Sequence, residues 1–191
     1  MDQKNLIPNV DLEGLTSLEL RNCKDLECLV YTTKQHVPTS GMFTNLVELV
    51  LENMIDLKML CNGQPPKGFL KKLTVKCCEK LQEVFRIDEL HYNREENQAP
   101  LLSNLDYLEL KFLPELRWVL KGSTQYVSLR CLKVVLIEGC NKLESLFSTS
   151  LIRSLRLLEE LDISSCDKLE TVFAELESDD ETIKHAMLAK L

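Results

Sequence analysis

Glycine, proline and aromatic residues are few in the sequence, and basic residues do not outnumber acidic ones. Six glycines and six prolines in 191 residues exclude collagen-like and low-complexity chains, and a hydrophobic share of 45% is that of a folded protein. The formal net charge is −7. Because phosphate contacts need clustered lysine and arginine, we expect no nucleic-acid partner and no attachment to anionic membrane surfaces.

Signals for secretion or membrane insertion are also missing. No apolar run approaches the roughly 18–20 residues that a membrane-spanning helix needs. The first residues, Met1 to Asn5, do not begin a signal peptide, and the sequence holds no Asn-x-Ser/Thr glycosylation acceptor. We therefore predict a cytoplasmic chain without a membrane span.

Residue patterns for catalysis are absent as well. The three histidines, His36, His91 and His185, are scattered, and no C-x-x-C pair accompanies them. His91 has carboxylates nearby in the sequence, in a stretch that is typical of a solvated loop. No nucleophile motif such as G-x-S-x-G occurs. The prediction is no enzyme, and no catalytic, cofactor-binding or metal-binding residue.

What the sequence does contain is one apolar pattern that recurs six times. Its first copy is Leu15-x-x-Leu18-x-Leu20-x-x-Cys23, continuing to Leu26 and Leu29. The six copies, or rungs, lie near residues 15–29, 46–60, 70–84, 105–119, 132–146 and 158–172. Counted at the second apolar position, the steps between copies are 31, 24, 35, 27 and 26 residues. Constant internal spacing with variable connectors is typical of a solenoid, and the pattern is that of leucine-rich repeats.

The Leu-x-Leu part of each copy alternates with period two, which predicts a short strand with one buried face. The predicted fold is an α/β solenoid: a leucine-rich-repeat horseshoe arc with a parallel concave β-sheet of about six strands and irregular loops or short helices on the convex side. We expect a single domain over 1–191. Its ends, 6–12 and 186–191, look like parts of further rungs, so we expect a fragment of a longer array or an array with covered ends.

The fifth rung admits two frames. One frame buries Val135 and Ile137, and the other, starting at Leu129, buries Val134. We prefer the first because it preserves the continuation from Cys140 to Leu143 and Leu146.

Cysteine recurs at one position of the pattern. We expect the four cysteines there to be small buried residues without disulfides, because successive rungs place them along one stacked edge. They are Cys23, Cys78, Cys140 and Cys166. The other four, Cys28, Cys61, Cys77 and Cys131, have no evident role.

The connectors between copies vary. Ser148-Thr149-Ser150 predicts the capped start of a helix that runs into the sixth strand. The ranges 31–42 and 86–100 predict long polar loops, and the acidic run 175–182 predicts a solvated connector.

Within the leucine-rich-repeat class, the phrasing resembles the repeat region of plant intracellular nucleotide-binding leucine-rich-repeat receptors, usually of the coiled-coil subclass. The segments that carry the resemblance are "LTSLELRNCKDLECL", "FLKKLTVKCCEKLQEVF", "LKVVLIEGCNKLESLF" and "LEELDISSCDKLETVF", within about residues 12–173. The resemblance implies recognition of pathogen effectors or of host proteins modified by them, and contact with the receptor's own nucleotide-binding domain. No G-x-x-x-x-G-K-[ST] phosphate loop lies in this chain, so nucleotide switching is not assigned to it.

The alternative is the repeat region of an F-box ubiquitin-ligase adaptor, which shares L-x-x-L-x-L-x-x-C. Those repeats usually continue with an Ile-Thr-Asp-like stretch, where this chain has Lys-Leu-Glu-x-Val/Leu-Phe.

The expected partner surface is the solvated face of the predicted strands. Its residues are Glu19, Arg21, Glu48, Glu52, Lys72, Thr74, Lys76, Tyr107, Glu109, Lys111, Val134, Leu136, Glu138, Glu160 and Asp162. Tyr107, Val134 and Leu136 form either an apolar anchor or a patch that merely packs across neighbouring rungs. A second hypothesis assigns an acidic partner to Lys72, Lys76, Tyr107 and Lys111.

Overall fold

The computed structural model describes residues 14–31, 45–62, 70–87 and 100–173. The three histidines, the acidic run 175–182 and both predicted terminal half-rungs lie outside these ranges, as does most of the two predicted polar loops.

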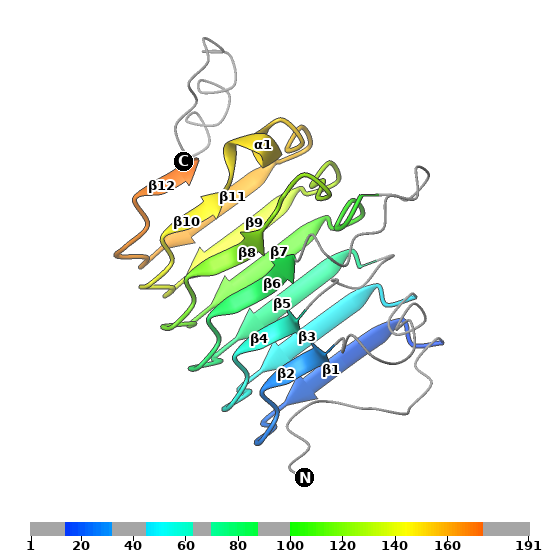
Figure 1. Cartoon of the computed structure of the whole chain (residues 1–191), viewed down its shortest axis with the longest axis vertical. Helices are drawn as coiled ribbons and strands as arrows, with labels where there is room; N and C mark the ends of the chain where they lie inside the picture. The colour runs from blue at the N-terminus through cyan, green and yellow to red at the C-terminus, as the bar shows by residue number, and fades with distance from the viewer. Residues whose placement is uncertain (1–13, 32–44, 63–69, 88–99, 174–191) are drawn as a thin grey trace.

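Two parallel six-stranded sheets make up the described chain, and each rung contributes one strand to each sheet (Figure 1). The first sheet has the order β1-β3-β5-β7-β9-β11. Its strands are Ser17–Arg21, Glu48–Glu52, Lys72–Lys76, Tyr107–Lys111, Val134–Glu138 and Glu160–Ser164. The second sheet consists of β2, β4, β6, β8, β10 and β12. Its strands are Cys28–Tyr31, Met59–Asn62, Glu83–Ile87, Trp118–Gly122, Ser145–Phe147 and Thr171–Phe173.

The six rungs share one internal spacing. In every rung the second strand begins 11 residues after the first, from 17 to 28 in the first rung through 160 to 171 in the sixth. The length differences between rungs therefore fall in the connectors that lead from the second sheet back to the first. The predicted leucine-rich-repeat solenoid is confirmed, with strands at the predicted positions.

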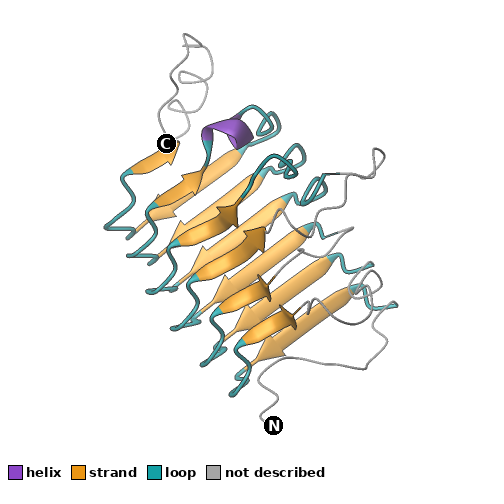
Figure 2. Cartoon of the chain, in the orientation of Figure 1, coloured by secondary structure: helices purple, strands orange, loops and turns teal. Residues whose placement is uncertain are grey.

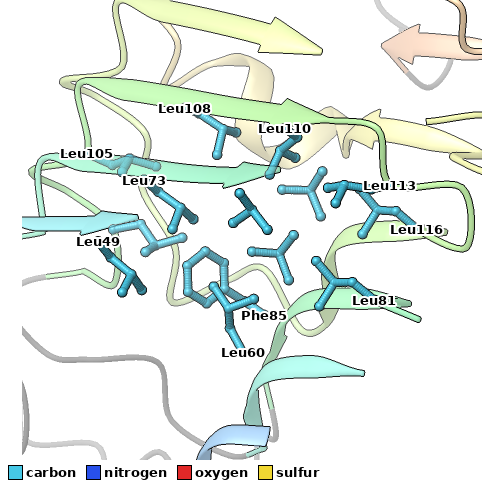
Figure 3. Packing of buried hydrophobic residues seen from close by; sticks show 14 of the residues in the cluster. Leu49, Leu60, Leu73, Leu81, Phe85, Leu105, Leu108, Leu110, Leu113 and Leu116 are labelled. Atoms are coloured by element: carbon cyan, nitrogen blue, oxygen red, sulfur yellow. The ribbon is translucent and has the colours of Figure 1, made fainter. Parts of the chain in front are cut away.

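Leucine side chains fill the space between the two sheets. Leu49, Leu73 and Leu108 point inward from the first sheet, and Leu60 and Phe85 meet them from the second (Figure 3). All five are at most 2% exposed. Full burial of one such side chain stabilises the fold by about 1.5–3 kcal/mol, so the repeated apolar positions account for the stacking of rungs.

A left-handed residue ends every strand of the first sheet. The backbone φ is between 53° and 66° at Asn22, Asn53, Cys77, Phe112, Gly139 and Ser165. In the first five rungs the N–H of this residue donates to the last carbonyl of the neighbouring first-sheet strand, at 2.7–3.0 Å. This turn sends the chain from the first sheet toward the second. Glycine and asparagine adopt such a φ at low cost, whereas Cys77 and Phe112 are held in it by their hydrogen bonds to the next rung.

Irregular loops or short helices were predicted on the convex side of the arc. That prediction was wrong, because the second parallel sheet lies there instead. The one helix among the described residues is the single turn α1, Thr149–Ile152 (Figure 2). It begins after Ser148 as predicted, but it ends at Ile152 instead of running into the sixth strand, and no side-chain hydrogen bond caps it. Val-Phe or Leu-Phe pairs recur in the second-sheet strands of several rungs, and valine and phenylalanine favour strands.

The structure also decides two narrower predictions. Val135 and Ile137 are buried, and Val134 is only partly so, which confirms the preferred frame of the fifth rung. All eight cysteines are free. Cys78 and Cys140 are fully buried as predicted, whereas Cys23 and Cys166, in the first and last rungs, are only partly buried. The Sγ of Cys78 and that of Cys140 each donate to the carbonyl two residues earlier, at 3.3 and 3.7 Å. Burial raises the pKa of the Cys78 thiol to about 11 and that of Cys140 to about 12.

Candidate functional site on the outward face of the first sheet

Three straight rows of side chains form the outward face of the first sheet. Every neighbouring pair of its strands is in register over all five residues. The upper row is Ser17, Glu48, Lys72, Tyr107, Val134 and Glu160. The middle row is Glu19, Val50, Thr74, Glu109, Leu136 and Asp162. The lower row is Arg21, Glu52, Lys76, Lys111, Glu138 and Ser164. All fifteen predicted surface residues lie in these rows, and the geometry brings them onto one face.

The middle row is less open than the sequence suggested. Thr74 and Glu109 are buried at 6% and 8% exposed, and the Lys76 side chain of the lower row contacts the Glu109 carboxylate. By contrast, Glu19 and Asp162 at the two ends are exposed. The accessible part of the face therefore lies mainly in the upper and lower rows and at its ends.

A network of ion pairs links the cations of this face to its carboxylates. Arg21 contacts Glu19 and, at 2.8 Å, Glu52 in the next rung. Lys72 lies 3.0 Å from Glu48. Exposed ion pairs of this kind contribute little to the stability of the fold, because solvent screens them.

Glu109 is the centre of the network. Its carboxylate lies 2.9 Å from Lys76 Nζ and 3.6 Å from Lys111 Nζ, and it accepts a hydrogen bond from the Tyr107 hydroxyl at 3.3 Å. Burial alone would raise the pKa of Glu109, but the hydrogen bond and charge of Lys76 outweigh it, so the pKa lies below its ordinary value. Lys111 also contacts Glu138, at 3.2 Å.

These contacts bear on the hypothesis of an acidic partner for Lys72, Lys76, Tyr107 and Lys111. Each of the three lysines already contacts a carboxylate of the same face. The Lys72 Nζ also lies over the Tyr107 ring, 5.3 Å from its centroid. An acidic partner would have to compete with carboxylates that are already in place, and the hypothesis stays a prediction.

An apolar patch lies toward the sixth rung. Tyr107 is in register with Val134, and Leu136 lies one row away beside Glu109 and Asp162. Val134 and Leu136 are half-buried, so part of each faces solvent. Glu160 and Asp162 on β11 have no ion pair with any residue that the structure describes.

Sequence reasoning missed a second polar cluster, on the second sheet. The carboxylate of Glu83 is buried between Arg86 and Lys121, next to Trp118. The signal in the sequence was weak, since a strand on this side was not predicted.

Within the described ranges, no three His, Cys, Asp or Glu side chains come together to hold a metal ion. The one short helix there is too short to cross a membrane.

Stacked rungs with an inward leucine ladder and an outward face of polar side chains define a leucine-rich-repeat solenoid, a fold that mediates protein interactions. The family described as "Plant disease resistance protein RPS2-like, leucine-rich repeats" matches residues 68–167, more than half of the chain. The chain belongs to this family of plant disease-resistance repeats. No curated protein and no solved structure gives a significant match.

Proposed function

We propose that this chain is the protein-recognition and regulatory module of a cytoplasmic plant immune receptor. In this proposal it senses a pathogen effector, or a host protein that an effector has modified, and takes part in the defence response. The parent receptor would be of the nucleotide-binding kind with a coiled-coil region, and the repeats would also contact its nucleotide-binding domain. The proposal includes no enzymatic step and no cofactor.

The observation that carries the proposal is the outward face of the first sheet. Its register holds charged and apolar side chains at fixed spacing, with cations and carboxylates already ordered by ion pairs. Ordered side chains lose little further conformational freedom on binding, and a fixed charge pattern selects partners. The membership in the disease-resistance family supports the kind of partner.

Within this face, the patch of Tyr107, Val134 and Leu136 is the best candidate for the anchor. Aromatic and aliphatic side chains near the centre of an interface contribute most of the binding energy. The acidic residues Glu160 and Asp162 lie beside it in the neighbouring strand, where their charge sets the choice of partner.

The test is a panel of pathogen effectors and their host targets, each co-expressed with the receptor in leaf cells and scored by co-precipitation and cell death. The decisive variant is Leu136→Arg, which places a charge in the apolar patch. Its matched control is Leu157→Arg, because Leu157 is 49% exposed and lies outside the first-sheet strands.

We expect a partner to be lost with Leu136→Arg and retained with Leu157→Arg. A partner that binds equally well to Leu136→Arg and to Asp162→Lys contradicts the assignment of this face. Co-precipitation of a ubiquitin-ligase scaffold, with no response to any effector, would favour the F-box alternative.

A further inference from the structure

The outward face of the second sheet carries a cluster of cations around one tryptophan. We call Glu83, Arg86, Arg117, Trp118 and Lys121 the Trp118 cluster. Strand pairing between β6 and β8 aligns Glu83 with Trp118 and Arg86 with Lys121, so the third and fourth rungs build the cluster together. It lies on the sheet opposite to the candidate site described above.

A buried carboxylate holds two of the cations in place. Glu83 accepts hydrogen bonds from Arg86 Nε and Nη2 at 2.7 and 2.9 Å, and from Lys121 Nζ at 2.6 Å. The Glu83 side chain is 4% exposed, whereas those of Arg86 and Lys121 are 39% and 41% exposed. Arg86 and Lys121 are therefore both held in place by Glu83, while part of each side chain stays exposed to solvent.

Trp118 orders the rest of the cluster. Its ring lies 4.2 Å from Lys121 Nζ and 5.9 Å from the Arg117 guanidinium carbon. Arg117 is exposed and has no ion pair with any described residue. The cluster contains three cations and one carboxylate, so its own residues sum to a formal charge of +2 in a chain whose net charge is −7.

This combination fits one kind of ligand. Tryptophan and arginine are the residue types in which binding energy concentrates, and cations that are already immobilised cost less conformational entropy on binding. The excess positive charge requires a negative partner, and the Trp118 ring offers an apolar surface to the stem of a glutamate or aspartate.

We propose that the Trp118 cluster binds an acidic peptide segment of a protein partner. A nucleic acid fits less well because its backbone needs a continuous track of lysine and arginine. Here the basic surface ends at the fifth rung, where Glu144 follows Arg117 in the stack. The inference is independent of the proposed function, since it concerns the other sheet.

The test uses the fluorescence of Trp118, which is the only tryptophan of the chain. The full chain is titrated with a synthetic peptide of ten glutamates and, separately, with a ten-nucleotide single-stranded DNA. We expect a saturable change in Trp118 fluorescence with the peptide, with an affinity that falls as salt is raised.

The decisive variant is Arg117→Glu, which leaves the Glu83 ion pairs intact. It should weaken peptide binding by about fivefold or more, because an attraction is replaced by a repulsion. Lys133→Glu is the control, as Lys133 is exposed and lies next to the first-sheet strand β9. Circular dichroism verifies that both variants fold.

Equal affinity of the two variants would overturn the proposal. So would the absence of a saturable change, or binding of the DNA as tightly as the peptide. Leu136→Arg should leave peptide binding unchanged, so this test and the test of the first-sheet face give separate answers.

Discussion

The two sheets come from the same six rungs, yet they differ in regularity. In the first sheet every residue of a strand pairs with its neighbour. In the second sheet the pairing omits the second residue of each strand, as at Val84 between Glu83 and Phe85. Successive side chains of a regular strand point to opposite faces, yet Val84 and Phe85 are adjacent and both belong to the hydrophobic core between the sheets. The regular alternation of sides is therefore broken at the point where the pairing is interrupted.

The sheets also hold one buried carboxylate each. Glu109 on the first sheet is surrounded by Lys76, Lys111 and Tyr107, and Glu83 on the second by Arg86 and Lys121. The surroundings of Glu109 are one stretch of a network that spans several rungs. Those of Glu83 form a compact cluster with excess positive charge. The charged contacts of the first face are therefore spread over several rungs, whereas those of the second face are concentrated around Glu83.

The largest expected effect is on the free energy of unfolding, and it differs between two glycines. One lies in a strand of the second sheet, and the other follows a strand of the first sheet. A Cβ at Gly122 in β8 would lie 2.1 Å from the Ile87 backbone oxygen, at a φ of +106°. A Cβ at Gly139, after β9, would lie 2.9 Å from Phe112 Cδ1, which is a side-chain atom that can move. We expect Gly122→Ala to lower the free energy of unfolding by about 4 kcal/mol and Gly139→Ala by about 1–2 kcal/mol. Urea denaturation measures both, and equal losses would contradict this account of the second-sheet ladder.

The next largest effect is a dependence of stability on pH that comes from the two buried carboxylates, Glu83 and Glu109. Burial alone would raise the pKa of Glu83, but hydrogen bonds from Arg86 and Lys121 and their charges outweigh it. The pKa values of Glu83 and Glu109 both lie below the ordinary 4.5. A lowered folded-state pKa contributes stability that is fully present above the unfolded value and is lost as pH falls through the folded value. We therefore expect the melting temperature to fall as the pH drops below about 4.5.

Glu83→Gln and Glu109→Gln sharpen this comparison. Each should reduce stability at pH 7, by about 1–2 kcal/mol, and should flatten the acid-side decline. The loss should be larger for Glu83→Gln, because the Glu83 side chain is 4% exposed and that of Glu109 is 10% exposed. Thermal melts between pH 3 and pH 7 check this, and a decline that stays unchanged in both variants would show that other groups cause it.

The smallest effect concerns the residues with positive φ that directly follow the strands of the first sheet. Cys77 has a φ of 54° and an exposed side chain, and it follows Asn22 and Asn53 in the stack. Asn53 Nδ2 donates to Asn22 Oδ1 at 2.6 Å, and an asparagine at 77 would place a third amide in that row. Cys77→Asn should raise the free energy of unfolding by about 0.5 kcal/mol, because asparagine tolerates this φ better than cysteine. Cys78→Asn is the control and should destabilise the fold, since Cys78 is buried; stabilisation by both would contradict the role of φ.

The repeat pattern predicted the first sheet almost residue by residue. The spacing of Leu73 and Val75 placed β5, and the outward residues Lys72, Thr74 and Lys76 followed from alternation. The frame of the fifth rung followed from the continuation to Cys140. The prediction of a single domain over 1–191 within a longer array remains a prediction.

The sequence by itself determined the six rungs, their parallel stacking and the set of outward residues, because a period of two fixes which side chains share a face. Only the tertiary structure decided that Glu109 is buried and paired, since its ion pairs come from Lys76 in the preceding rung and Lys111 in its own rung. It also decided that a second sheet closes each rung and that Glu83, Trp118 and Lys121 meet there. The contact of Glu83 with Lys121 joins residues 38 positions apart, and the geometry of such contacts between rungs depends on how the rungs stack.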